Sequence, residues 1–214
     1  MSTTTPGHQP QEPPVPQPIL TLRKSHIRQY HDSDVPHVQR AADSPAVARY
    51  LTESFPSPYT LSDAENWIAY ALTATVPNDP LNTPVAFAIC NKETDIPLGG
   101  IGMKVGYAAE GWDHILEVAY WLGEAAWGKG IMTEALGGFV GWLFGRFPRL
   151  MRLEAGVFEG NDGSVKVLET VGFMLEGKRR KQGVDRLGGW CDVLEFGLLR
   201  EEWVKRNAEG ATGN

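Results

Sequence analysis

The residues with the clearest chemical potential form a glycine-rich turn, AWGKGIMTEA, at residues 126–135, where Gly128 and Gly130 flank Lys129. An apolar, helix-like run follows them. The first N–H groups of a helix lack internal partners and lie at the positive end of its dipole, and glycine lets a ligand approach the main chain closely. The turn therefore predicts an anion site, with phosphate as the favoured anion. A strand-to-helix turn whose glycines serve backbone geometry alone explains the Gly-Lys-Gly triplet equally well.

Two nucleotide-binding motifs can be compared with this turn. A Walker loop requires Ser or Thr directly after Gly-Lys, and Gly130 stands at that position, which excludes the motif. A dinucleotide-binding fingerprint requires a third glycine where Thr133 stands, although Glu154, 24 residues beyond Gly130, has the spacing of the acidic residue that binds the ribose. A dinucleotide-binding βαβ protein therefore stays open as a remote alternative.

The segments around the turn must position it. Strands are predicted, from alternating or doubly apolar patterns, at 19–23, 83–91, 96–106, 114–123, 152–160, 173–180 and 189–199. Helices are predicted at 32–51 with a break near Ser44, at 61–75, at 129 to about 146, and at 161–172. Ser62 is predicted to cap the helix at 61–75, with Glu65 as its capping-box partner. The turn then lies between a central strand and a long helix in a fold that mixes α and β structure.

The composition predicts one compact soluble domain. Of the 214 residues, 42% are hydrophobic, which suffices for one sizeable core. The net charge of −6 argues against binding to nucleic acid or to a membrane surface, because such proteins usually present a basic face. No apolar stretch approaches the roughly 18 residues of a membrane span, and no signal sequence is evident, so a cytoplasmic location is expected. Cys90 and Cys191 indicate neither a disulfide framework nor a zinc site.

Both ends of the chain differ in composition from the middle. Residues 1–18 hold six prolines and hardly any apolar side chains, so they are predicted to form a disordered arm. Residues 207–214 are typical of a flexible tail. The folded domain is predicted to span residues 19–206.

Three blocks in register carry a family resemblance: LEVAYWLGEAAWGKGIMTEAL at 116–136, LEAGVFEGNDGSVKVLETVGFMLEG at 153–177, and WCDVLEFGLLREEW at 190–203. In order and spacing they resemble the GNAT superfamily of N-acetyltransferases, and within it the ribosomal-protein N-terminal acetyltransferases RimJ and RimL. The resemblance covers residues 19 to about 205. It implies an α/β (α+β) fold of GNAT type, with a mixed, mostly antiparallel sheet of about six or seven strands and helices on both faces.

The resemblance also implies acetyl-coenzyme A as co-substrate and no metal. The pyrophosphate would lie on the amides of a loop that consists here of Trp127, Gly128, Lys129, Gly130 and Ile131. The pantetheine arm would pair with the strand at Tyr120, Trp121 and Leu122. Asn161 and Ser164, from the next helix, would contact the arm and the sulfur.

Two positions depart from the family pattern. Ala125 stands where the loop usually has Gln or Arg, and Leu168 stands where many relatives have a tyrosine that donates to the leaving thiolate. Ser164 is the predicted substitute donor. A catalytically degenerate module that binds acyl-CoA without turnover is therefore an alternative to an active enzyme.

Direct transfer of an acetyl group to an amine requires a group that removes a proton from the amine. Glu117 is the predicted general base, because it interrupts the apolar strand HILEVAYWL and shares a face with Ala119 and Trp121 by strand alternation. An ordinary cross-strand pairing explains Glu117 equally well. Asp113, Glu154 or an ordered water are alternative bases.

The predicted activity is the transfer of an acetyl group from acetyl-CoA to a primary amine. The expected partner is that acceptor, either a protein or peptide N-terminus or a small molecule. The protein is expected to be a monomer or a homodimer, with no nucleic-acid or membrane partner. The basic run at residues 178–181 is interpreted as a solvated hairpin, with an acidic-substrate site as the less favoured reading.

Overall fold

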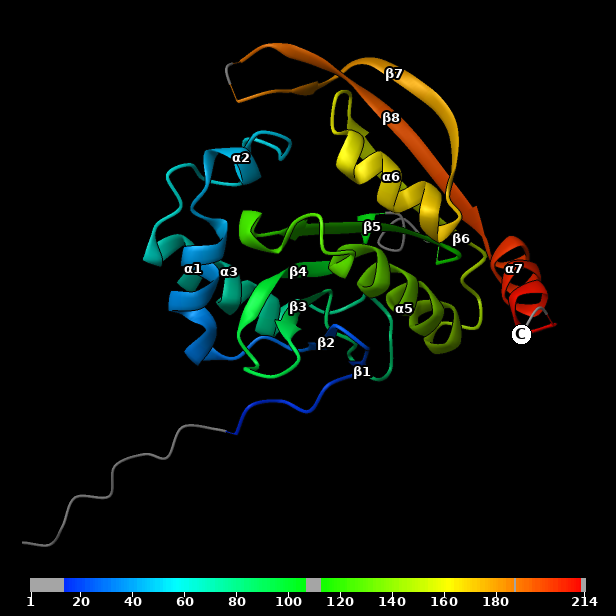
Figure 1. The fold of residues 1–214 in the computed structure, drawn as a ribbon, viewed down its shortest axis with the longest axis horizontal. Coiled ribbons are helices and arrows are strands. Elements are labelled where there is room, and N and C mark those ends of the chain that lie inside the picture. Colours follow the sequence, from blue (N-terminus) through cyan, green and yellow to red (C-terminus); the bar gives the residue numbers. More distant parts are fainter. Residues whose placement is uncertain (1–13, 107–112, 187, 213–214) are drawn as a thin grey trace, which may run out of the picture.

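An eight-stranded sheet runs through the part of the chain that the computed structural model describes, residues 14–106, 113–186 and 188–212 (Figure 1). The strands are β1 (Leu20–Thr21), β2 (Ser25–Arg28), β3 (Ala86–Asn91), β4 (Pro97–Lys104), β5 (Ile115–Leu122), β6 (Arg152–Phe158), β7 (Met174–Val184) and β8 (Trp190–Leu199). The helices are α1 (Val35–Ala42), α2 (Pro45–Ala48), α3 (Leu61–Thr73), α5 (Ile131–Arg146), α6 (Asp162–Val171) and α7 (Arg200–Thr212). Two 3-10 turns, η1 (Asp32–Asp34) and η2 (Glu124–Ala126), precede α1 and follow β5.

The strand order is β1-β2-β3-β4-β5-β6-β8-β7, and all neighbours are antiparallel except β5 and β6. The predicted mixed, mostly antiparallel sheet is confirmed, with slightly more strands than expected because Ser25–Arg28 also pairs. One parallel pair among the described strands does not make the repeated βαβ sheet of a dinucleotide-binding fold. That remote alternative is wrong.

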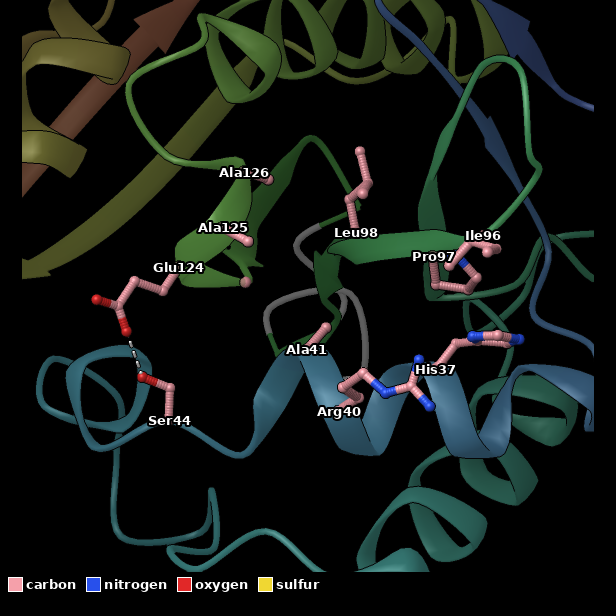
Figure 2. Close-up of a pocket in the computed structure, with 11 residues that line it drawn as sticks. His37, Arg40, Ala41, Ser44, Ile96, Pro97, Leu98, Glu124, Ala125 and Ala126 are labelled. Carbon is pink, nitrogen blue, oxygen red and sulfur yellow. Dashed lines mark hydrogen bonds between the residues drawn. The ribbon is translucent and has the colours of Figure 1, made fainter.

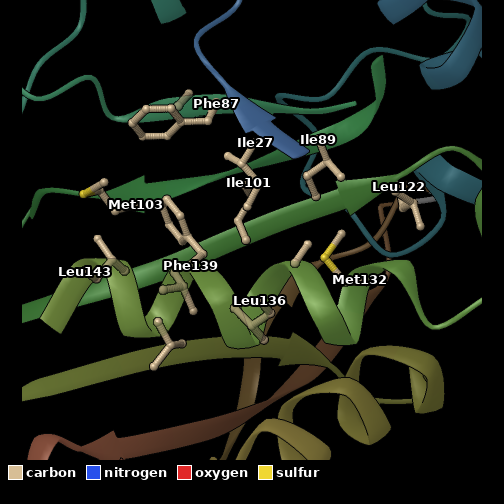
Figure 3. Packing of buried hydrophobic residues seen from close by; sticks show 14 of the residues in the cluster. Ile27, Phe87, Ile89, Ile101, Met103, Leu122, Met132, Leu136, Phe139 and Leu143 are labelled. Atoms are coloured by element: carbon tan, nitrogen blue, oxygen red, sulfur yellow. The ribbon is translucent and has the colours of Figure 1, made fainter. Parts of the chain in front are cut away.

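Helices cover both faces of the sheet, as expected. On one face α5 packs across the strands, and the ring of Phe139 lies 5.7 Å from that of Phe87 on β3 (Figure 3). On the other face lie α1 and α3, and Trp67 of α3 meets Tyr30 edge to face. Strand β3 is buried along residues 86–90 because it lies between these two layers, in agreement with its doubly apolar sequence.

The N-terminus of α3 differs from the prediction. Thr60 is the N-cap and accepts a hydrogen bond from the Asp63 N–H at 3.2 Å, while the Asp63 carboxylate accepts one from the Thr60 N–H at 2.7 Å. The predicted cap, Ser62 with Glu65, is therefore wrong by two residues. Both pairs have the spacing of a capping box, so the helix start depends on where the incoming chain leaves the extended conformation at Thr60.

The two ends of the described chain bear on segments that the sequence set apart. Helix α7 runs to Thr212 and so includes residues 207–212, while a flexible tail at residues 207–214 stays a prediction. Residues 14–18 of the predicted arm have no helix or strand, and residues 1–13 lie outside the described residues. Among the residues described, no helix combines the length and the apolar character needed to cross a membrane.

Arg28 of β2 is a buried cation, only 2% exposed. Its guanidinium donates to both carboxylate oxygens of Asp34, at 2.8 and 2.9 Å, and its Nε donates to Asp95 at 2.8 Å. The same Asp95 oxygen lies 2.5 Å from His26 Nε2. His26, Cys90 and Asp95 form a set whose possible ligand atoms lie close enough together to hold a metal ion. The guanidinium beside the Asp95 oxygen opposes a cation there, so we interpret the set as a structural hydrogen-bond network.

Asp34→Ala is expected to lower the free energy of unfolding by about 3–5 kcal/mol, because it leaves the buried Arg28 charge without its bidentate partner. Asp32→Ala is the matched control, since Asp32 lies two residues away and is exposed, and it should cost less than about 0.5 kcal/mol. Urea unfolding followed by circular dichroism measures both variants. Equal unfolding midpoints for the two would contradict the stabilising role of the Asp34 pair.

Candidate active site

Strands β5 and β6 separate after three paired residues. The parallel register joins Ile115–Glu117 to Arg152–Glu154, whereas β5 continues to Leu122 and β6 to Phe158. The remainder of each strand keeps only its other neighbour, β4 for β5 and β8 for β6. The gap that results is called the β5–β6 opening below.

The backbone of β5 turns alternate residues toward this opening. Gly123 donates its N–H to the Leu98 carbonyl of β4 at 2.8 Å. Because neighbouring residues of a strand direct their backbone groups to opposite sides, Val118, Tyr120 and Leu122 direct theirs toward β6. An extended ligand in the opening would therefore find strand-like hydrogen-bonding groups.

The side chain of Tyr120 meets α6 at the opening. Its hydroxyl lies 2.8 Å from the Ser164 hydroxyl. Burial raises the pKa of Tyr120 to about 12, against the opposing effect of the hydrogen bond with Ser164, so the phenol stays protonated at neutral pH. Asn161 accepts the Ser164 N–H through its side chain at 3.2 Å, which caps α6 and holds the serine at the start of that helix.

Leu168 is fully buried in the core, and its apolar side chain offers no donor at the position where the resemblance implies a tyrosine. The Tyr120 hydroxyl lies beside Ser164 instead. Sequence reasoning assigned Tyr120 a backbone role and missed its hydroxyl. Strand alternation offered a signal, because Tyr120 must lie on the face opposite Glu117 and Trp121.

The turn after β5 presents a helix N-terminus without a side-chain cap. Gly128 and Gly130 both have φ of +69°, in the left-handed region that favours glycine. Gly130 is the N-cap of α5 and Ile131 is its first residue, so no capping side chain covers the first N–H groups of the helix. Nothing lies within 4 Å of the place that a Cβ at Gly128 would occupy. The turn therefore has the open backbone that an anion requires, with Lys129 exposed between the glycines.

The turn between β1 and β2 adds a second cation that sequence reasoning missed. Lys24 donates from Nζ to the Lys129 carbonyl at 2.6 Å. The Glu134 carboxylate of α5 holds this turn in place by accepting the N–H groups of Arg23 and Lys24 at 3.2 and 2.8 Å. Lys24 and Lys129 thus both lie at the N-terminus of α5. Their separation of 105 residues left no local sequence signal.

Two tryptophans flank the end of β5. Trp127 donates its indole N–H to the Leu122 carbonyl at 2.7 Å, which ties the turn to the strand end. Trp121 lies on the opposite face from Tyr120, with its ring 5.9 Å from that of Phe55. The backbone of Trp121 pairs with Gly100 of β4, so the backbone N–H and carbonyl of Trp121 point away from the opening.

The face of the opening opposite Tyr120 carries carboxylates. Glu117 accepts a hydrogen bond from Lys104 Nζ at 2.6 Å, so the cross-strand pairing considered for it is present. The Glu117 Oε1 lies 3.9 Å from the place of a Cβ at Gly156, and the missing side chain of Gly156 leaves room for this carboxylate. Glu117 keeps 26% of its side chain exposed, so it is accessible from solvent.

Glu195 of β8 lies opposite Gly156 in the sheet register. Burial raises the pKa of Glu195; Arg179 opposes this shift, and the negative charges of Glu117 and Glu154 add to it. Sequence reasoning missed Glu195, although it interrupts the apolar stretch VLEFGLL as Glu117 interrupts its own strand. Glu195 Oε1 lies 3.3 Å from Arg179 Nε. A carboxyl group with a raised pKa is a candidate for proton transfer.

A cleft of about 680 Å³ lies beside the turn, on the side of α1, rather than in the opening (Figure 2). Its lining consists of His37, Arg40, Ala41, Ser44, Ile96, Pro97, Leu98, Gly123, Glu124, Ala125 and Ala126. Ser44 donates to Glu124 at 2.9 Å at one end of it. Ala125, one of the two departures from the family pattern, lines this cleft.

Comparison with known proteins shows the family of the chain. The sequence matches the acetyltransferase (GNAT) domain family over residues 25–174. The uncharacterized N-acetyltransferase p20 of Bacillus licheniformis is 30% identical over 186 residues, which are 86% of this chain and 95% of the relative.

Solved structures share the fold. The ribosomal-protein-S5-alanine acetyltransferase of Vibrio fischeri has a TM-score of 0.67 at 20% identity, over 86% of this chain and 97% of the other. RimL, a ribosomal L7/L12 α-N-protein acetyltransferase solved in complex with coenzyme A, has a TM-score of 0.69 at 16% identity. The match covers 86% of this chain and 98% of RimL. Since the family match spans most of the sequence, the chain belongs to the GNAT family of acetyl-CoA-dependent N-acetyltransferases.

Proposed function

We propose that the protein transfers the acetyl group of acetyl-CoA to the α-amine at the N-terminus of a protein or peptide. The observation that carries this proposal is the β5–β6 opening, which has the Tyr120–Ser164 hydroxyl pair on one face and the carboxylates of Glu117 and Glu195 on the other. An α-amine has a pKa of about 7.7–8.0, against about 10.4 for lysine, so a carboxylate base suffices near neutral pH. Two of the compared structures have ribosomal-protein acceptors in their names.

Acetyl-CoA is proposed to bind across the turn and the opening. Its pyrophosphate would lie on the amides from Gly128 to Ile131, with positive charge from Lys129 and Lys24. The absence of a cap on α5 supports this placement, because an anion would then satisfy N–H groups that no side chain reaches.

The pantetheine arm is proposed to lie along the free side of β5. The backbone groups of Val118 and Tyr120 and the Leu122 N–H would pair with its amides, while the Leu122 carbonyl already accepts from Trp127. The backbone of Trp121 pairs with β4, so only its ring would contribute. The ring lies on the face of the opening opposite Tyr120, which carries Glu117 and is called the acceptor face below. Asn161 would act mainly through its cap on α6, which positions Ser164.

The protein's part in the reaction is proton transfer at the two faces of the opening. Tyr120, aided by Ser164, is proposed to donate to the thiolate that leaves as the amine attacks the thioester carbon. Glu117 or Glu195, directly or through water, is proposed to accept the amine proton, and the raised pKa favours Glu195. The Tyr120 hydroxyl supplies a donor that Leu168 does not, which argues against a catalytically degenerate module.

The test is a mass-spectrometric assay on a peptide that has both a free α-amine and a lysine. Acetylation dependent on acetyl-CoA is expected at the α-amine, with equimolar release of coenzyme A thiol. The matched control is the same peptide with its N-terminus blocked, which should remain unmodified. Acetylation of the lysine alone, or of small amines but no peptide, would contradict an N-terminal acceptor. Binding of acetyl-CoA without thiol release for any amine would favour the degenerate module.

A further inference from the structure

A second cavity, of about 530 Å³, lies where α2, the end of β6 and the β7–β8 hairpin meet. Its lining includes Arg49, Tyr50, Phe158, Asp185, Arg186 and Cys191. The proposed binding of acetyl-CoA uses none of these residues. Two arginines, Arg49 and Arg186, and two acidic residues, Glu159 and Asp185, line the cavity.

The cavity lies on the acceptor face of the β5–β6 opening. Glu117 and Glu154 are register partners. Trp121 of β5 and Phe158 of β6 each lie four residues further along, so they occupy the same level and the same face of the two diverging strands. That level is one residue, about 3.3 Å, beyond the level of Tyr120.

Arg186 brings an unsatisfied donor into this cavity. Its Nε donates to the Ala48 carbonyl at 3.1 Å, which anchors the hairpin to α2. Its Nη2 is buried, and within the described part of the chain it has no hydrogen-bond partner. A buried donor of a charged group without an acceptor costs free energy, and an anionic ligand would remove that cost.

The second arginine is also available to an anion. The Arg49 guanidinium lies 5.2 Å from the centre of the Tyr50 ring, and no carboxylate of the described residues forms an ion pair with it.

The acids beside these arginines are already engaged. Glu159 accepts a hydrogen bond from Lys178 at 2.6 Å, and Asp185 accepts the Gly189 N–H at 2.8 Å. Of the two acids in the lining, Glu159 is thus paired with a lysine that does not line the cavity, and neither acid forms an ion pair with Arg49 or Arg186 among the described residues.

We propose that this cavity, called the Arg49–Arg186 pocket, binds an acidic side chain within the first three residues of the acceptor. The inference rests on the proposed N-terminal acceptor and names its class, an acidic peptide N-terminus. The amine and the carboxylate of such an acceptor match two separate charges of the protein. The carboxylates of Glu117 and Glu195 face the amine, and the two guanidinium groups face the acid, each with the planar fork that fits a carboxylate.

The test uses two decapeptides of identical composition. One has Glu at positions 2 and 3 and Gln at positions 8 and 9, and the other has these residues exchanged. The native protein is expected to acetylate the first with at least about a tenfold higher kcat/KM, through a lower KM, which corresponds to about 1.4 kcal/mol. Equal net charge in the two peptides removes long-range attraction as an explanation.

Three variants locate the preference. The double variant Arg49→Gln and Arg186→Gln is expected to treat both peptides alike, with an unchanged KM for acetyl-CoA. Arg180→Gln is the matched control, because Arg180 lies exposed on β7 of the same hairpin and does not line the pocket, and it should keep the preference. If loss of the hydrogen bond from Arg186 to the Ala48 carbonyl unfolds the double variant, the single variant Arg49→Gln tests the inference. Its preference for the first peptide over the second is expected to fall at least threefold.

Each other outcome overturns the inference. The inference fails if the native protein acetylates both peptides at equal rates, or if the preference persists in the double variant. Either result would show that the pocket does not recognise the acidic side chain, and would leave the proposal of an N-terminal acceptor unaffected. Acetylation of neither peptide would remove the proposed acceptor and this inference together.

Discussion

Gly130→Asp is expected to raise the dissociation constant for acetyl-CoA by at least about a hundredfold, or about 2.7 kcal/mol. Gly130 is the N-cap of α5, and a Cβ there would lie 2.7 Å from Lys24 Nζ. An aspartate would place its carboxylate among the same N–H groups and the same lysine that the pyrophosphate is proposed to use, so it would repel the phosphates. The protein should still fold, because aspartate is favoured at N-caps and tolerates left-handed backbone better than most residues.

Isothermal titration with acetyl-CoA measures the effect. Gly145→Asp, the same substitution near the other end of α5 with open space around it, is the matched control and should bind as the native protein does. Lys129→Ala should weaken binding modestly, because it removes one exposed charge and leaves the amides in place. An unchanged affinity in Gly130→Asp would remove the turn from the coenzyme site.

Glu195→Gln is expected to lower kcat by about 10²–10⁴ with little change in acetyl-CoA affinity, as removal of a general base does. Glu117→Gln, at the residue that the sequence alone predicted as the general base, is the direct comparison. In the structure Glu117 is paired with Lys104 at 2.6 Å and Glu195 with Arg179 at 3.3 Å. The two carboxylates differ in that burial and neighbouring carboxylates raise the pKa of Glu195. A base with a raised pKa is closer to the operating pH, which favours Glu195 as the proton acceptor.

The pH dependence separates the two carboxylates. A general base must be ionised, so activity falls as pH decreases through its pKa, and a raised pKa places this acid limb above the usual carboxyl range. The acid limb should disappear in Glu195→Gln and persist in Glu117→Gln. The reverse result would restore Glu117 as the base, and an intact limb with rates within threefold of the native protein in both variants would exclude both. Ser164→Ala should be milder, because Tyr120 remains as a donor.

Local features of the site could be predicted because their causes are local. The glycines at 128 and 130 indicated a bare helix start, and both adopt the left-handed backbone that makes glycine necessary there. The period of two in β5 placed Glu117 and Trp121 on one face. The cap of α3 was missed although it is local, since two pairs of equal spacing compete for it.

The sequence by itself determined the order of the strands and helices other than β2 and α7, the bare turn before α5 and the family, because hydrophobic period, turn residues and motif spacing are properties of neighbouring residues. Only the tertiary structure decided that the hydroxyl of Tyr120 meets that of Ser164, 44 residues later, and that Lys24 lies beside Lys129. It also decided that the negative charge of Glu117 acts on the pKa of Glu195. These pairs arise where β5 and β6 diverge and where separate turns come together. Their geometry depends on how the whole sheet packs against its helices, which no local pattern encodes.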